Sequence, residues 1–267
     1  MRKISIIDNG LEISKQIAEQ LIEKFKELDF EILTSTVNDA ELIVCIGGDG
    51  SFLSTLAKFN FPTIPFAGIN TGHLGFFQEL DEEDIDFFIE RYLVGKYARQ
   101  KYRTVEGVVK CNGKEENVRG LNEIVIKSNN YRLAHLDIYI GDNFIEKFSG
   151  DGIVVSTPAG STAYNYALGG SLVDPRLNLL QLTPIAATSN AAYRSFTSGI
   201  ILPPDLNLEI RTQEESENEI SIAVDGNDTG FENVSKISIG LSEGEVELLR
   251  FKDYEFWNTV KQKLLTE

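Results

Sequence analysis

The chain is poor in the residue types that mark several classes of protein. Its 267 residues include two cysteines, Cys45 and Cys111, and two histidines, His73 and His135. The two cysteines lack metal-ligand spacing and form no disulfide framework, so we interpret both as reduced packing residues. Only two side chains are available as imidazole bases. A serine nucleophile of the hydrolase type is therefore set aside.

Positive charge is also scarce. The chain has 25 Lys and Arg residues against 41 Asp and Glu, a formal net charge of −16. Such a protein repels a phosphodiester backbone, so we expect no nucleic-acid partner. No apolar run approaches the length of a membrane span, and the first residues contain no signal-peptide core, so we expect a cytoplasmic protein without a membrane partner. A hydrophobic content of 42% supports a full core, and the length allows two domains.

The first hundred residues alternate between apolar strand-like runs and segments of helical periodicity. The predicted strands are residues 4–7, 31–33 and 42–46, and residues 62–69 form another apolar segment. The predicted helices are residues 10–28, 51–59 and 81–92. This alternation is typical of a doubly wound α/β domain.

The pattern changes after about residue 101 to short alternating strands separated by Asn, Gly and Asp turns. Residues 253–265 then return to helical spacing, with Phe256, Val260 and Leu264 four apart. We therefore predict an α/β domain over residues 1–101, a β-rich nucleotide-binding domain over 102–249, and a C-terminal helix within 250–267 that packs back on the first domain.

The sequence Gly47-Gly48-Asp49-Gly50 directly follows the apolar run at 42–46. At the carboxyl end of a parallel strand, such a turn faces the ligand crevice, and the N-terminal amides of the next helix point to the same place. A phosphate and a hydroxyl-activating carboxylate are thus expected to meet there. The alternative is an Asp-Gly turn without chemistry.

A second stretch of small and hydroxyl residues spans residues 156–164. It follows a predicted strand at 152–155 and precedes a helix expected from Ser161 or Thr162 through Ala167. Hydroxyls and free amides at a helix start form a nucleotide site, and Tyr164 adds a stacking face. An ordinary capped helix is the alternative. Polar residues also open two predicted strands: Asn122 and Glu123 before one, and Asp151 before the other.

Taken together, these motifs closely resemble the NAD kinases, and the resemblance extends over essentially the whole chain. The segments that carry it, in chain order, are Gly47-Gly48-Asp49-Gly50, residues 68–76, Asn122-Glu123, Asp151-Gly152, residues 157–164, residues 168–170 and residues 224–226. The family implies transfer of the ATP γ-phosphoryl group to the 2′-hydroxyl of the adenosine ribose of NAD. It also implies Mg²⁺ carried largely by the nucleotide, no protein metal site, and a homodimer or homotetramer.

The resemblance also assigns roles to individual residues. Asp49 is the candidate catalytic base and, with Asn122 and Glu123, is placed at the adenosine ribose. No Walker sequence is present, so phosphate binding is assigned to Gly47, Gly48 and Gly50. The remaining nucleotide-binding candidates are Phe76, Thr162 and Ala163 at the adenine, and Asp151, Tyr164, Asn165, Ala167, Ala186 and Asp225 along the rest of NAD.

Three positions differ from patterns associated with relatives: Ala159 and Ala167 lack a hydroxyl, and Asp174 replaces a common His. His73 is interpreted as a loop residue that shapes the site, and His135 as structural. Because the motifs fall in both predicted domains, we expect NAD to contact each of them. Two rival functions remain open: a lipid or sugar-phosphate kinase that shares the Gly-Gly-Asp-Gly turn, and a non-catalytic dinucleotide sensor.

Overall fold

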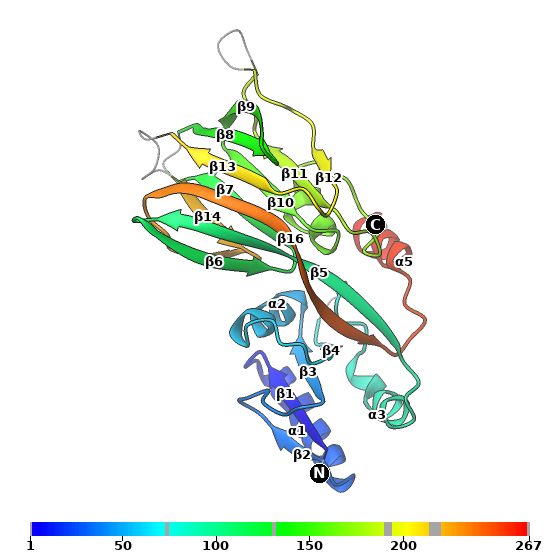
Figure 1. Cartoon of the computed structure of the whole chain (residues 1–267). Coiled ribbons are helices and arrows are strands. Elements are labelled where there is room, and N and C mark those ends of the chain that lie inside the picture. Colours follow the sequence, from blue (N-terminus) through cyan, green and yellow to red (C-terminus); the bar gives the residue numbers. More distant parts are fainter. Residues whose placement is uncertain (1, 73–74, 130–131, 190–193, 214–219, 266–267) are drawn as a thin grey trace. The chain divides into compact units, whose positions relative to one another are not determined.

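A computed structural model describes residues 2–72, 75–129, 132–189, 194–213 and 220–265. The chain divides into two compact units: unit 1 contains residues 1–101 and 246–267, and unit 2 contains residues 102–245. The chain leaves unit 1 within strand β5 (Ala98–Cys111) and returns to it within strand β16 (Val234–Arg250) (Figure 1). Unit 1 is thus built from two segments that are distant in sequence.

Unit 1 contains a parallel sheet with the strand order β2-β1-β3-β4, and the end of β16 joins β4 in parallel at Leu248 and Phe66. Its strands are β1 (Lys3–Asp8), β2 (Glu31–Leu33), β3 (Leu42–Gly47) and β4 (Phe66–Asn70). Its helices are α1 (Glu12–Glu27), α2 (Asp49–Lys58), the short η1 (Glu82–Asp84), α3 (Ile85–Leu93) and α5 (Phe256–Val260).

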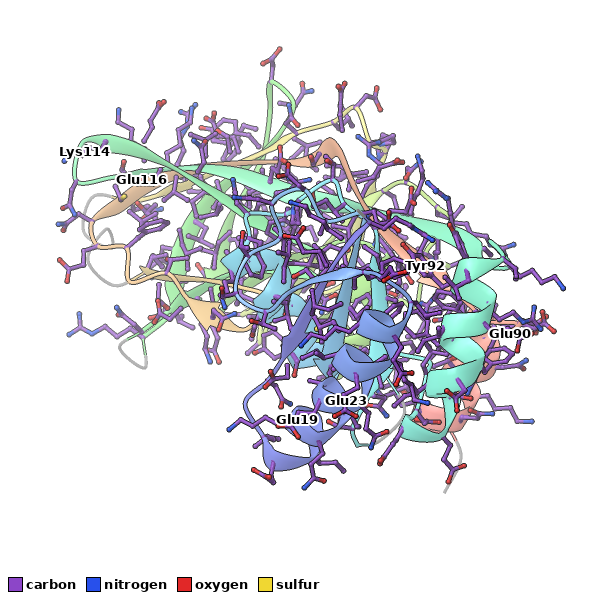
Figure 2. All side chains as sticks on the ribbon, turned by 90° about the horizontal axis from the view of Figure 1, so that it is seen from below. Glu19, Glu23, Glu90, Tyr92, Lys114 and Glu116 are labelled. Carbon is purple, nitrogen blue, oxygen red and sulfur yellow. The ribbon has the colours of Figure 1, made fainter. Side chains whose placement is uncertain are left out.

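Burial explains the sequence patterns of unit 1. Every residue of β3 is buried, which accounts for its continuous apolar run, because both faces of a parallel sheet are covered. Helix α1 instead buries one stripe that includes Ile17, Leu21 and Phe25. Its Glu19 and Glu23 lie on the opposite, exposed face (Figure 2). The 3.6-residue period thus separates the core side of the helix from its acidic side.

The strand order creates a switch point between β1 and β3. From β1 the chain passes through α1 to β2, and from β3 it passes through α2 to β4, on the other side of the pair. At such a point the loops after the two strands diverge and leave room for a ligand. The Gly-Gly-Asp-Gly turn follows β3 at this edge.

Unit 2 is β-rich and has two sheets. One is antiparallel in the order β12-β11-β10-β7-β14-β15, and the other contains β13, β8 and β9 beside β16, with β5 and β6. Apolar residues from both sheets, such as Ile153 and Leu136, form a single buried cluster. The strand bounds are β6 (Lys114–Gly120), β7 (Glu123–Ser128), β8 (Ala134–Ile140), β9 (Asn143–Gly150), β10 (Gly152–Ser156), β11 (Leu180–Ile185), β12 (Ile200–Leu202), β13 (Leu208–Thr212), β14 (Ile220–Val224) and β15 (Asn227–Asp228).

The predicted fold class is confirmed: an α/β unit, a β-rich unit, and a last helix that belongs to the first unit. Two helix predictions were wrong in extent. The helix expected through Ala167 is instead two short pieces, η2 (Ala159–Thr162) and α4 (Tyr164–Ala167), because Ala163 between them is non-helical at φ −95°, ψ −132°. The tail helix starts at Phe256, and residues 261–265 continue it with wider π-type turns.

Candidate active site

In unit 1, the ends of three strands meet at the Gly-Gly-Asp-Gly turn. Asn9, after β1, donates its side-chain amide to Ser51 Oγ at 3.3 Å, and Ser51 Oγ also accepts the Gly48 N–H at 3.3 Å. Thr71, after β4, donates its backbone N–H to the Gly47 carbonyl at 3.3 Å. The turn is therefore tied to the loops of both neighbouring strands at the switch point of the sheet.

Asp49, the first residue of α2, points its carboxylate at the backbone of residues 75–77. Its Oδ2 accepts the Phe76 N–H at 2.9 Å, and its Oδ1 accepts the Phe77 N–H at 3.1 Å. A Cβ at Gly75 would lie 2.4 Å from Asp49 Oδ1, so only glycine permits this approach. Lys263 Nζ lies 3.0 Å from Asp49 Oδ2. The carboxylate is thus fixed by two amides and paired with one cation.

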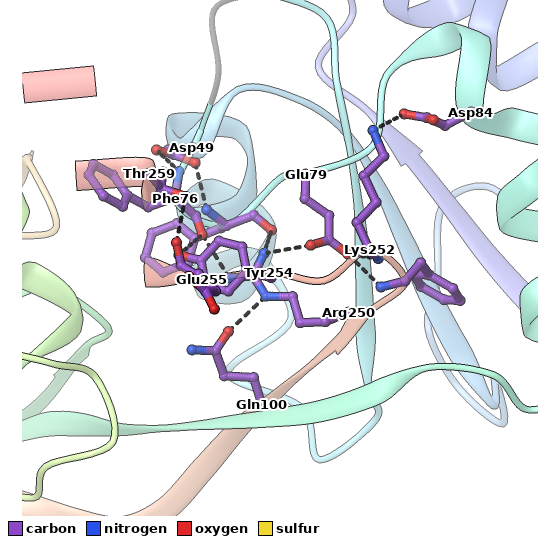
Figure 3. A network of polar contacts seen from close by, with 12 residues as sticks. Asp49, Phe76, Glu79, Asp84, Gln100, Arg250, Lys252, Tyr254, Glu255 and Thr259 are labelled. Carbon is purple, nitrogen blue, oxygen red and sulfur yellow. Dashed lines mark hydrogen bonds and ion pairs between the residues drawn. The ribbon is translucent and has the colours of Figure 1, made fainter. Parts of the chain in front are cut away.

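A buried arginine holds the same backbone segment from its carbonyl side (Figure 3). Arg250 is 3% exposed and donates to the carbonyls of Phe76 at 2.8 Å and Phe77 at 3.3 Å. It also donates to Gln100 Oε1 at 2.7 Å and lies 3.9 Å from Glu79 Oε2. Phe76 and Phe77 thus accept hydrogen bonds from Arg250 through their carbonyls and donate hydrogen bonds to Asp49 through their amides. Arg250 therefore positions the carboxylate indirectly.

Arg250 was missed by the sequence prediction. The sequence signal for Arg250 is its position directly after the apolar strand residues 248–249. A cation is seldom buried in a core without dedicated partners, so a charged residue at such a position indicates a structural role.

In unit 2, Asp225 organises the turn that precedes β7. Its Oδ2 accepts the Leu121 N–H at 2.7 Å, and its Oδ1 accepts those of Asn122 at 2.7 Å and Glu123 at 3.1 Å. Asp225 itself has φ +47°, a conformation that costs energy in a non-glycine residue and is often found at functional sites. Three predicted site residues, Asn122, Glu123 and Asp225, therefore form one cluster.

Two buried atoms of this cluster have no hydrogen-bond partner within the described residues: Asn122 Oδ1 and Glu123 Oε2. Asn122 is 7% exposed and Glu123 is 4% exposed. Burial, together with the charge of Asp225, raises the pKa of Glu123 to about 8. Burial also raises the pKa of Asp225, against the effect of its three amide hydrogen bonds. Unpaired polar atoms at this depth suit a ligand that brings hydroxyl or amide groups.

The 157–164 segment is joined to this cluster through its backbone. Thr157 donates its N–H to the Asn122 carbonyl at 2.9 Å and its hydroxyl to the Leu121 carbonyl at 2.6 Å. Gly160 approaches so closely that a Cβ there would lie 2.1 Å from the Asn122 oxygen. The small residues of the motif thus serve a close backbone contact. The sequence predicted a nucleotide site formed by the free amides at a helix start in this motif. Helix α4 is only four residues long, so its helix dipole contributes little to such a site.

Asn165 faces the interior rather than solvent. It is fully buried, accepts the Thr183 hydroxyl at 2.6 Å, and donates to the Ser161 carbonyl at 3.4 Å and the Ser171 carbonyl at 3.3 Å. Its side chain therefore holds the segment in shape. Of its neighbours in the predicted set, Thr162 and Ala163 are half-buried, and Tyr164 and Ala167 are exposed.

Asp151 and Ala186 lie together, but at the opposite end of β10. The Asp151 N–H donates to the Ile185 carbonyl at 2.9 Å, and Ala186 follows with φ +44°. Strand geometry puts Asp151 about 20 Å from Thr157, at roughly 3.3 Å per residue. The structure thus collects the unit 2 candidates into two groups and does not bring those groups together.

The remaining candidates are also placed. Phe76 is 7% exposed, and its ring lies 6.0 Å from that of Phe256. His135 Nδ1 is 2.9 Å from Ser149 Oγ, in a structural position, and His73 lies outside the described residues. In the described ranges, no group of three or more His, Cys, Asp or Glu side chains is arranged to hold a metal ion. No described helix is both long and apolar enough to cross a membrane.

Comparison with known proteins shows the family. Residues 11–97 match the model of the ATP-NAD kinase N-terminal domain, and residues 121–251 match that of the ATP-NAD kinase C-terminal domain. The NAD kinase of Finegoldia magna is 36% identical over 266 residues, covering 98% of this chain and 97% of the relative. The NAD kinase of Enterococcus faecalis is 31% identical over 269 residues, covering 99% of each.

Two solved structures share the fold. A yeast NADH kinase complexed with NADH has a TM-score of 0.86 at 21% identity, covering 99% of this chain and 87% of that chain. An NAD kinase from Archaeoglobus fulgidus in complex with ATP has a TM-score of 0.77 at 22% identity, covering 98% of each. The family models and the near-full-length relatives together show that the chain belongs to the ATP-NAD kinase family and is an enzyme of the NAD kinase type.

Proposed function

We propose that the protein transfers the γ-phosphoryl group of ATP to the 2′-hydroxyl of the adenosine ribose of NAD, which yields NADP and ADP. The observation that carries this proposal is the Asp49 carboxylate, fixed by two backbone amides at the switch point of the α/β sheet in a chain of this family. The family supplies the substrate class, and the fixed carboxylate supplies a group suited to the acceptor hydroxyl.

In the proposed reaction, the ribose 2′-oxygen forms a bond to the γ-phosphorus, and the bond from that phosphorus to the ADP oxygen breaks. A ribose hydroxyl is a poor nucleophile, so the proton that it loses needs an acceptor, and Asp49 is assigned that role. Holding Asp49 in one orientation before substrate binds reduces the cost of aligning it in the transition state.

The NAD-binding proposal uses residues of both units. In unit 1, Gly47, Gly48 and Gly50 are assigned to phosphate and Phe76 to the adenine. In unit 2, the unpaired buried oxygens of Asn122 and Glu123 support their assignment to NAD. The other proposed contacts are Asp225, Thr162, Ala163 and Tyr164 near that cluster, Ala167 beyond it, and Asp151 with Ala186 as a second group. Asn165 is proposed to shape the segment that carries Thr162 to Tyr164.

A divalent cation, by family Mg²⁺, belongs to the proposal as part of the ATP complex. Bound there, Mg²⁺ neutralises triphosphate charge, which a protein with a net charge of −16 would otherwise repel.

A homodimer or homotetramer in the cytoplasm completes the proposal. Strand β9 lies at the edge of its sheet and exposes Phe144 (50%) and Ile145 (44%), which supports association through this strand. The two cysteines are buried free thiols, which fits a reducing compartment. Light scattering after size-exclusion chromatography measures the oligomeric state, and a monomer would contradict that part.

The test of the function is incubation of the purified chain with NAD and ATP-Mg²⁺, with product measured by an NADP-specific coupled dehydrogenase. Parallel reactions offer a diacylglycerol and a sugar phosphate as acceptors. We expect NADP in the first reaction and no transfer to the other acceptors. Transfer to a lipid or sugar phosphate without NADP would replace the proposal with the rival kinase. NAD binding without product would indicate a sensor.

A further inference from the structure

Lys263 is an unusual neighbour for a carboxylate that must accept a proton. It follows α5 in the C-terminal segment of unit 1, and its Nζ lies 3.0 Å from Asp49 Oδ2 and 4.7 Å above the Phe76 ring. The segment is anchored by the buried Thr259 and Val260 and by the contact of Phe256 with Phe76. The ammonium of Lys263 is therefore held at the Asp49 carboxylate by a segment that packs against the rest of unit 1.

The hydrogen bonds of Asp49 define what Lys263 blocks. A carboxylate offers about four acceptor positions. One on Oδ1 is used by Phe77, and those on Oδ2 are used by Phe76 and Lys263. A hydroxyl that donates its proton to Oδ2 must therefore displace the lysine.

Displacement is inexpensive because the pair is only partly buried. The Lys263 side chain is 31% exposed and that of Asp49 is 24% exposed, and ion pairs with such access to water favour the paired state by no more than about five-fold. A triphosphate carries several charged oxygens and makes stronger charge-assisted hydrogen bonds with an ammonium. Lys263 therefore forms a stronger interaction when it moves from the Asp49 carboxylate to a phosphate that binds close to its ammonium.

Two other cations of unit 1 are already engaged elsewhere. Arg250 is buried against the Phe76 and Phe77 carbonyls, and Lys252 pairs with Asp84 at 2.6 Å. The chain has no Walker lysine and is strongly acidic. Lys263 is therefore the cation that the structure places at the Asp49 carboxylate.

We infer that Lys263 is an exchangeable cation of the phosphoryl-transfer site. It pairs with Asp49 while no donor is bound, and it moves to a phosphate oxygen when the nucleoside triphosphate binds. The move frees the second acceptor position of Asp49 Oδ2 for the acceptor hydroxyl. This inference rests on the proposed function, in which Asp49 is the base and ATP the donor.

The test compares Lys263→Gln and Lys263→Arg with Lys252→Gln, a matched control that breaks another partly exposed ion pair of unit 1. Affinity for ATP-Mg²⁺ is measured by isothermal titration calorimetry, and KM is measured separately for ATP and NAD. Lys263→Gln should weaken ATP roughly five- to thirty-fold, the range for losing a charge-assisted contact in a partly exposed site. KM for NAD should stay within about two-fold.

Lys263→Arg should retain most of the ATP affinity, and Lys252→Gln should bind ATP as the unaltered protein does. Wild-type ATP affinity in Lys263→Gln would overturn the inference, and so would an equal loss for ATP and NAD. Higher turnover with unchanged ATP affinity would also overturn it, because Lys263 would then only block Asp49. If the unaltered protein forms no NADP but binds ATP in a Lys263-dependent way, the proposed function fails and the cation's donor contact stands.

Discussion

Glu123 should make the stability of unit 2 depend on pH in an unusual direction. Its carboxyl group is 4% exposed, and burial beside Asp225 raises its pKa from 4.5 to about 8. Between these two pH values the folded state keeps a proton that the unfolded state has lost. The free energy of unfolding therefore falls as pH rises through this window, and the effect is complete above pH 8.

The perturbation is Glu123→Gln, which keeps the size of the side chain and removes its charge. Each pH unit within the window corresponds to about 1.4 kcal/mol, so the full difference amounts to about 5 kcal/mol at most. The variant and the unaltered protein should be similarly stable near pH 4.5. The variant should then become progressively more stable than the unaltered protein, by about 2 to 5 kcal/mol at pH 8.

The assay is urea unfolding at several pH values between 5 and 9, followed by circular dichroism. The single tryptophan, Trp257, lies in unit 1, so its fluorescence separates the unfolding of that unit from that of unit 2. Glu116→Gln, at an exposed position on β6 (Figure 2), is the control and should leave the pH dependence unchanged. A stability difference that is constant across the range, or larger at low pH, would refute the reasoning.

Three further predictions concern the site. Asp49→Asn should leave folding and NAD binding largely intact but lower turnover by about two to four orders of magnitude, because it removes the positioned base; near-normal kcat in a folded variant would contradict the role of Asp49. Asn122→Ala should raise KM for NAD by about five- to a hundred-fold through loss of a buried hydrogen bond, with KM for ATP little changed; the reverse pattern would show that the site is misassigned. Gly75→Ala should lower kcat more than ten-fold, because its Cβ would lie 2.4 Å from Asp49 Oδ1 and displace the carboxylate; Gly72→Ala, with open space around its added Cβ, is the control, and equal kcat in both variants would argue against this coupling.

Local patterns were sufficient for most of the architecture. Residues 31–33 were predicted as a strand with the bounds that β2 has. The four-residue spacing of Ile13, Ile17, Leu21 and Phe25 predicted one face of α1; the last three are buried, whereas Ile13 is 45% exposed. These features depend on neighbours in sequence, where the periods of helix and strand apply. The interruption at Ala163 was not predictable in this way, because the close contact of Gly160 with Asn122 joins residues far apart in the chain.

The sequence by itself determined the class of the protein: its alternating patterns and ordered motifs indicate the two-part fold and the family, because each motif is a contiguous stretch with its own local chemistry. Tertiary structure alone decided how those motifs are used. It turned Asp49 toward the amides of Phe76 and Phe77, buried Arg250 behind them, and brought Lys263 from 214 residues away to the same carboxylate. It also turned Asn165 inward and left oxygens of Asn122 and Glu123 unpaired. Hydrogen bonds, burial and charge pairing across such separations depend on how the whole chain packs, and no local period encodes them.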